Sequence, residues 1–213
     1  MNKPALSRES VLDAALALAD REGLPAVTVR RLAGEFGVTP MAMYWHFANK
    51  DELLAAMGQA VLFELEVQAE ASFSELLRGL VTVLRKHPAA VSLVPTQMFA
   101  TSQGLQVTER ALALLAELGF SVGEAANIAR TAMDLCVMLV VGEPGREIGM
   151  DECEREKHLA GKLAAIRGLS AEQYPHVLAA AEPLTGVGDA EEFYRSSVEL
   201  FVAGVEARAF ALR

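Results

Sequence analysis

The residues best suited to chemistry lie close together, in the run Tyr44–Phe47, which reads Tyr-Trp-His-Phe, and at Lys50 just behind it. Aromatic, imidazole and ammonium groups in one short segment suit contact with the phosphates of DNA. Met43 and Phe47 are four residues apart on one helical face, so we expect them to fill a core. Two adjacent aromatic residues on a short helix cannot both face that core. Tyr44 and Trp45 are therefore predicted to point outward and contact DNA; the alternative is that they are ordinary core aromatics.

Three predicted helices position this run. The first spans residues 7–21, where apolar residues recur at the spacing of one buried stripe. The second starts with Thr28 as its N-cap and ends at Gly37, because glycine readily adopts the left-handed conformation of a helix end. The third has Thr39 as its N-cap and Pro40 at its first position, where the missing N–H costs nothing. A helix, a tight turn and a short helix ending in outward aromatic side chains predict a helix-turn-helix.

A larger helical part follows. A fourth helix starts with Asn49 as its N-cap and Glu52 three residues later, and we expect it to reach Gln68 or beyond. Further helices are predicted over residues 73–86, 89–100, 104–118, 122–141, 151–167, 171–182 and 190–211. Signals for β-hairpins are missing from the sequence. The sequence thus predicts an all-α fold, with a three-helix helix-turn-helix domain at residues 1–50 joined to a larger helical domain at residues 51–213.

Charge is unevenly distributed along the 213 residues. The formal net charge is −9, which argues against a general nucleic-acid binder. Residues 1–57, however, hold six Lys and Arg against seven Asp and Glu, so the acidity lies beyond the predicted helix-turn-helix. An acidic body need not repel DNA that only the small end touches. Tight binding would then depend on a small, well-placed set of contacts.

The two cysteines, Cys136 and Cys153, match no zinc or redox spacing, and we expect them to be buried or idle thiols. This use of cysteine is typical of a reduced, cytoplasmic protein. The first residues contain no continuous apolar segment of the secretory type. The longest charge-free apolar run, Leu135–Val141, is far shorter than the ~20 residues of a membrane span. We therefore expect a cytoplasmic protein with no membrane partner.

The stretch from Ser7 to about Met57 resembles the tetracycline-repressor (TetR/AcrR) family of bacterial transcriptional regulators. The matching elements, in the family's order and spacing, are Glu22-Gly23, Thr28–Ala33, Phe36–Val38, Met43–Phe47 and Lys50–Leu54. The remainder is similar to the family only in architecture, as a helical ligand-binding and dimerisation domain of the right length. The resemblance implies a ligand-responsive repressor that binds a palindromic operator as a homodimer and is released by a small, largely apolar effector.

The resemblance also implies which residues bind DNA. Arg30 matches a base-contact position, and its guanidinium can meet O6 and N7 of guanine together. Because Met41 is apolar, we expect the remaining readout to come from contact with thymine methyls and from DNA shape. Phosphate-holding positions are matched by Thr28, Trp45, His46 and Lys50. The complete predicted set is Thr28, Arg30, Thr39, Pro40, Met41, Tyr44, Trp45, His46 and Lys50.

The segment Thr131–Val141 is apolar almost all round, which predicts a buried central helix. This helix is either plain bundle core or one wall of a ligand cavity. Asp134 either pairs with Arg130 one turn back or faces a cationic ligand. Methionine adapts to irregular shapes, although methionines at helical spacing are also ordinary core residues. The candidate ligand-binding residues are Met98, Phe99, Met133, Asp134 and Met138.

The last predicted helix carries an apolar stripe that is long for one intramolecular face. With the helix over residues 122–141 it could form a four-helix interface in a dimer, where the resemblance also places dimerisation. The alternative is a helix docked only within its own subunit. The candidate interface residues are Leu135, Phe193, Val198, Phe201, Val202 and Val205.

The expected partners are a double-stranded DNA operator, an unidentified small-molecule effector and a second copy of the chain. No cofactor or metal is expected, because no cysteine or second histidine lies at ligand spacing from His46. An enzyme is not expected either, since the sequence shows no nucleophile–base pair and no Gly-rich phosphate loop. The alternative function is a helical protein that binds or sequesters small molecules, with a weak or vestigial DNA-binding head.

Overall fold

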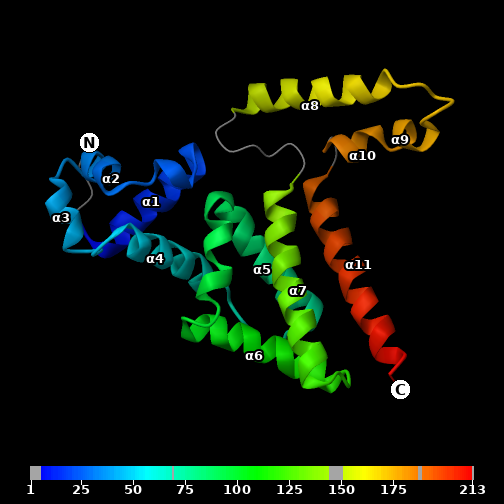
Figure 1. Ribbon diagram of the computed structural model, residues 1–213, viewed down its shortest axis with the longest axis horizontal. Coiled ribbons are helices and arrows are strands. Elements are labelled where there is room, and N and C mark those ends of the chain that lie inside the picture. Colours follow the sequence, from blue (N-terminus) through cyan, green and yellow to red (C-terminus); the bar gives the residue numbers. More distant parts are fainter. Residues whose placement is uncertain (1–5, 69, 144–150, 187–188, 213) are drawn as a thin grey trace.

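The computed structural model describes residues 6–68, 70–143, 151–186 and 189–212, and every regular element in these ranges is helical. Figure 1 shows a group of short helices at the N-terminal end, a body of longer helices, and an arm formed by α8, α9 and α10. The predicted all-α fold class is confirmed.

The N-terminal unit consists of α1 (Arg8–Glu22), the 3-10 turn η1 (Leu24–Ala26), α2 (Val29–Phe36) and α3 (Pro40–Tyr44). Its core residues are almost completely buried and comprise Val11, Ala15, Leu18, Leu32, Phe36, Met43 and Phe47. The predicted helix-turn-helix is therefore present, and the two residues that the spacing indicated, Met43 of α3 and Phe47 just after it, are both buried.

Helix α4 (Lys50–Phe63) connects the N-terminal unit to the body. It ends at Phe63, so the predicted extension to Gln68 is wrong. The amides of Glu64 and Leu65 bond to carbonyls three residues back, which tightens the chain. Leu65 is buried beside Gly79 of the next helix, where a Cβ would lie only 3.2 Å from the Leu65 Cδ1. Packing Leu65 against that glycine therefore ends α4 early.

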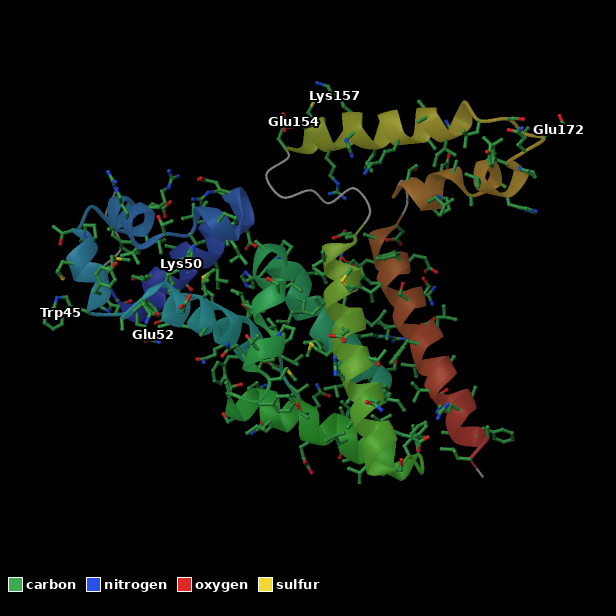
Figure 2. All side chains as sticks on the ribbon, viewed as in Figure 1. Trp45, Lys50, Glu52, Glu154, Lys157 and Glu172 are labelled. Atoms are coloured by element: carbon green, nitrogen blue, oxygen red, sulfur yellow. The ribbon has the colours of Figure 1, made fainter. Side chains whose placement is uncertain are left out.

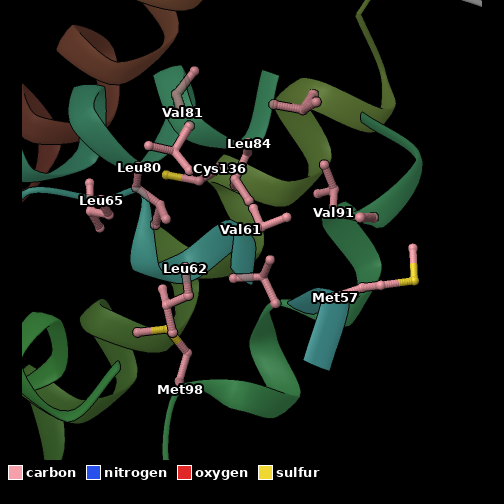
Figure 3. Close-up of a cluster of buried hydrophobic side chains, with 14 of the residues drawn as sticks. Met57, Val61, Leu62, Leu65, Leu80, Val81, Leu84, Val91, Met98 and Cys136 are labelled. Carbon is pink, nitrogen blue, oxygen red and sulfur yellow. The ribbon is translucent and has the colours of Figure 1, made fainter. Parts of the chain in front are cut away.

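The body is built around α5 (Phe73–Lys86) and α7 (Val122–Val141), with α6 (Ser102–Glu117) packed against both. Side chains of α4, α5 and α7 meet in one buried cluster that includes Val61, Leu84 and Cys136 (Figure 3). Because α4 takes part in this cluster, the N-terminal unit and the body share one continuous apolar core.

The segment between α5 and α6 differs from the prediction. In place of one helix over residues 89–100 there are two 3-10 turns, η2 (Pro88–Leu93) and η3 (Pro95–Gln97). Pro95 has no N–H and cannot continue an α-helical ladder. Helix α6 begins at Ser102 instead of residue 104, because Thr101 is its N-cap and accepts the amide of Gly104 at 3.0 Å.

Helices α8 (Glu152–Arg167), α9 (Pro175–Ala179) and α10 (Ala181–Thr185) form the arm, and α11 (Ala190–Phe210) returns along α5 and α7 (Figure 1). The single helix predicted over residues 171–182 is wrong, because Pro175 starts a new helix and only a turn precedes it. Among the described residues, no helix is long and apolar enough to cross a membrane.

Candidate DNA interface and ligand cavity

The turn between α2 and α3 is fixed by local backbone chemistry. Thr28 caps α2, and its hydroxyl accepts the amide of Arg31 at 3.1 Å. Gly37 follows α2 with φ 65°, and the amide of Val38 returns to the carbonyl of Ala33 at 3.0 Å. These bonds set the direction in which α3 leaves, and they explain why short-range sequence patterns predicted the motif.

Helix α3 presents an unusual apolar surface to solvent. Trp45 is 86% exposed, Met41 70% and Tyr44 48%, while Met43 and Phe47 on the opposite face are each 3% exposed. Trp45 lies at the outer tip of the N-terminal unit in Figure 2. Thr39 and Pro40 are exposed on the same short helix. Large apolar side chains displayed next to one another indicate a surface that meets a partner.

The cations near α3 divide into free and paired groups. Arg31 is held by Glu22 at 2.8 Å and by Glu35 at 3.7 Å. Arg30 is exposed and, within the described part of the chain, takes part in no ion pair. Lys50 is exposed at the first position of α4, whose free N–H groups and dipole favour an anion. Arg30 and Lys50 are thus available to an external anion, whereas Arg31 forms ion pairs within the N-terminal unit.

A clamp formed by Arg8 holds the junction of α3 and α4. The Arg8 Nη1 donates to the carbonyl of His46 at 2.6 Å and pairs with Glu52 at 3.1 Å, and its guanidinium lies 4.4 Å from the centre of the Phe47 ring. Glu52 also accepts the amide of Ala48 at 2.8 Å. The Ala48 amide, followed by Arg8, lowers the pKa of the Glu52 carboxyl. The sequence marked Glu52 as a capping residue, but nothing in it connected Arg8 to a partner 44 positions away.

A cavity of about 520 Å³ lies between α5, α6, α7 and η3. Of the predicted ligand-binding residues, Met98, Phe99, Met133 and Asp134 line it. Met138 does not line the cavity and is 60% exposed elsewhere on α7. The structure therefore brings four of the five predicted residues together.

Most of the cavity wall was missed by the sequence reasoning. The additional lining residues are Phe73, Leu76, Leu77, Leu80, Pro95, Val107, Thr108, Ala111, Leu112, Ala126, Ala129, Arg130 and Ala132. One sequence signal could have indicated the cavity, namely the alanines in the first half of α7. Small side chains on a helix that packs against two other helices leave space between them. Arg130 and Asp134 both reach this wall, and within the described residues they form no ion pair with each other.

The predicted dimer residues fall into two groups. Val198 and Val205 are buried within the chain, where α11 packs against α5 and α7. Leu135 is only partly buried, as are Phe193, Phe201 and Val202. The same two helices also display apolar side chains that the prediction left out, namely Val122, Val141, Leu200 and Phe210, which are 56–88% exposed.

Among the described residues, no group of three or more His, Cys, Asp and Glu side chains could hold a metal ion. Cys136 is buried, and burial raises its pKa to about 12, which keeps the thiol protonated. Cys153 is exposed, so the expectation of an idle thiol there rests on its sequence spacing alone.

Comparison with known proteins gives matches along the whole chain. A family model of bacterial regulatory proteins of the tetR family matches residues 11–57, and one of the tetracyclin repressor-like C-terminal domain matches residues 68–209. An HTH-type transcriptional regulator of Saccharopolyspora erythraea is 29% identical over 97% of this chain and 87% of its own length.

Two solved structures share the fold. ActR of Streptomyces coelicolor in complex with actinorhodin aligns with a TM-score of 0.74 and 24% identity, over 97% of this chain and 99% of ActR. BioQ with its double-stranded DNA operator aligns with a TM-score of 0.61 and 23% identity, over 95% of this chain and 99% of BioQ.

Proposed function

The chain belongs to the tetR family of bacterial regulatory proteins, and from this premise we propose that it is a ligand-responsive repressor that binds a palindromic operator as a homodimer and is released by a small, largely apolar effector. A DNA surface on α3 and a cavity in the body supply the two binding functions. Helix α4 connects them.

On the DNA side, α3 enters the major groove with Pro40, Met41 and Tyr44 against the bases. Arg30 binds guanine, because its guanidinium is exposed and free to form two parallel hydrogen bonds. Thr28, Thr39, Trp45, His46 and Lys50 hold the flanking phosphates. In support, the Arg8 clamp fixes the carbonyl of His46 and the start of α4, so these groups are held in place before DNA arrives.

A second copy of the chain pairs through α7 and α11. The apolar side chains that these helices display, including Met138 and Leu200, have the composition of a dimer interface rather than of a solvated face. Two recognition helices in a symmetric dimer bind half-sites about one helical turn, ~34–36 Å, apart.

The effector occupies the cavity. Its volume of about 520 Å³ is that of a drug-sized guest, and the wall is mostly aliphatic and aromatic. Arg130 and Asp134 supply the few polar contacts. The effector is accordingly a molecule with a broad apolar body and a polar edge that both accepts and donates hydrogen bonds.

The observation that carries this proposal is a contact between the cavity wall and α4. Pro95 and Met98 line the cavity, and Gln97 between them receives a hydrogen bond of 3.0 Å from Gln59 of α4. Gly58, next to Gln59, lies so close to this segment that a Cβ would be 2.9 Å from the carbonyl oxygen of Leu93. A guest that moves the wall therefore moves α4, and α4 carries the DNA-binding unit.

For release to follow, the effector must bind the displaced arrangement more tightly than the DNA-bound one. A preference of ~1–3 kcal/mol is the usual size of such coupling.

Selection of random double-stranded DNA by the purified protein at physiological salt tests the proposal. We expect an enriched inverted repeat with half-sites about one helical turn apart. If no sequence is enriched while circular dichroism shows a folded helical protein, the repressor proposal fails. That result would favour the alternative of a helical protein that binds or sequesters small molecules.

A further inference from the structure

Asp20, Glu64 and His87 form a polar junction where three parts of the chain meet. Asp20 lies near the end of α1, Glu64 directly follows α4, and His87 lies between α5 and η2. The Nδ1 of His87 is 3.3 Å from Oδ2 of Asp20, and its Nε2 is 2.8 Å from Oε1 of Glu64. One imidazole ring thus connects the DNA-binding unit, the end of α4 and the body.

This geometry requires a particular protonation state of the ring. A neutral imidazole has a single N–H, whereas both ring nitrogens here face carboxylate oxygens, which only accept when ionised. Both hydrogen bonds form together only if His87 is the imidazolium cation. In the neutral ring, one nitrogen lone pair faces a carboxylate and that bond is lost.

Both carboxylates are held in place by a second partner. Oδ1 of Asp20 accepts the amide of Ala89 at 3.4 Å, and Oε2 of Glu64 pairs with Lys86 at 2.9 Å. Of the elements packed against η2, α1 supplies Asp20, the end of α4 supplies Glu64 and α5 supplies Lys86. Among the described residues of α7, no charged group acts on the ring. Within the described residues, the charges that act on the ring are therefore those of Asp20 and Glu64, with Lys86 paired to Glu64.

We propose that His87 is a proton-operated latch that holds the DNA-binding unit against the body at the base of α4. With the ring protonated, α1 and the end of α4 are both tied to the start of η2. With the ring neutral, one tie is lost and the DNA-binding unit is held less firmly. His87 is a positioning residue, since it lies outside both the cavity wall and the α3 surface.

The pH range follows from the surrounding charges. The hydrogen bond to Asp20, opposed by burial and reinforced by Glu64, raises the pKa of His87 above its ordinary 6.5. A raised folded-state pKa means that the latch is complete below about pH 6.5 and is lost as the pH rises through the raised value. Burial opposes ionisation of Glu64, but Lys86 and His87 outweigh it and lower the pKa of that carboxyl, so Glu64 stays anionic throughout this range.

Amide hydrogen exchange of the full chain without DNA tests the latch. His87→Gln is compared at pH 6 and pH 9 with His176→Gln, a control at an exposed histidine of α9. At pH 6 we expect the His87 variant to lose about tenfold protection over the last turns of α1 and over residues 60–67, the size of one charge-assisted bond. At pH 9 the two variants are expected to agree within about twofold, because the latch is then open in both.

Asp20→Asn supplies an independent second variant, because it keeps the side-chain shape and removes the negative charge of the acceptor. It is expected to reproduce the loss at pH 6. Equal losses at both pH values would identify His87 as ordinary packing, and unchanged protection at pH 6 in either variant would show that no latch exists; each result overturns the proposal. Since DNA is absent, these outcomes do not depend on whether the protein is a repressor.

Discussion

The N-terminal unit displays large apolar side chains at α3, whereas the cavity wall of the body buries most of its own. Met41 on α3 and Trp45 directly after it are 70% and 86% exposed, while Leu77 and Met98 on the cavity wall are 4% and 7% exposed. An exposed apolar surface needs a large partner to cover it, and a buried one around about 520 Å³ suits a small guest. This difference supports the proposal that DNA binds one region and the effector the other, with α4 packed against α1 of the first and η3 of the second.

The largest expected effect separates the DNA surface from the rest of the molecule. Replacing Arg30, Tyr44 and Lys50 together with alanine removes the proposed base contact, a proposed groove contact and a proposed phosphate contact. Specific operator affinity is expected to fall on the order of 10³-fold, measured by fluorescence anisotropy at fixed salt.

A matched control exists on the arm, where Arg155, Lys157 and Tyr174 are the same residue types and equally exposed. Their triple alanine variant is expected to bind the operator as the parent does. Similar losses of operator affinity in both variants would mean that charge alone drives binding. That result would contradict the proposal that DNA binds at the N-terminal unit.

The next largest effect concerns the contact of α4 with η2 and η3, the two turns that connect it to the cavity wall. Gly58→Ala places a Cβ 2.9 Å from the carbonyl oxygen of Leu93, so α4 and η2 must move apart. We expect the free energy of unfolding to fall by about 1–3 kcal/mol, measured by urea denaturation, and operator affinity to fall with it. Gly161→Ala on α8 is the control, because its Cβ meets nothing within 4 Å. A Gly58 variant with unchanged operator affinity would show that α4 does not carry displacements to α3.

Two methionines of α7 test whether the effector binds in the cavity of the body. Met133 lines the cavity, and Met138 is exposed outside it. For any effector found by thermal stabilisation of the protein, Met133→Ala is expected to weaken effector binding roughly tenfold, because buried apolar contact is lost. Met138→Ala should leave the effector Kd unchanged in isothermal titration calorimetry. The reverse ranking would place the effector outside this cavity.

The smallest expected effect tests whether the Arg8–Glu52 clamp holds the proposed DNA surface in place before DNA binds. Glu52→Gln weakens the clamp with Arg8, and we expect operator affinity to fall only roughly twofold to threefold, because the pair is solvent-exposed. The pKa of Glu52 is lowered, so its contribution is present above pH 4.5 and is lost as the pH falls through the lowered value. Glu75→Gln is the control, since Glu75 also lies in the first turn of its helix and accepts a backbone amide, that of Ser72, but on α5 and away from the proposed DNA surface. Equal operator affinities in the two variants would show that the clamp plays no part in DNA binding.

The regions also differ in how far the sequence predicted them. Thr28 and Gly37 determine the turn through hydrogen bonds that span three to five residues, and Pro40 occupies the first position of α3, where no N–H is needed, so the types and spacing of these residues were enough. The exposed and buried faces of α3 followed from the same short-range periodicity.

The cavity depends on contacts between distant segments. Leu77 and Val107 line the same cavity as Ala126, Ala129 and Ala132 of α7, at sequence separations of 19 to 55 residues, and no local pattern encodes such a wall. The same reason explains why the Arg8 clamp was missed, and why the early end of α4 at Phe63, beside the buried Leu65, was missed. The 3-10 turns after α5 and the break before Pro175 had visible proline signals, which the helical periodicity of the flanking residues outweighed.

The most direct test of the account is linkage between the two regions. Operator affinity should be measured with and without a saturating effector, using the selected inverted repeat and a molecule that stabilises the protein against heat. We predict that the effector raises the operator Kd by roughly 5- to 150-fold, and that the operator weakens effector binding by the same factor. An effector that stabilises the protein but leaves the operator Kd unchanged would contradict the claim that the cavity controls DNA binding through α4.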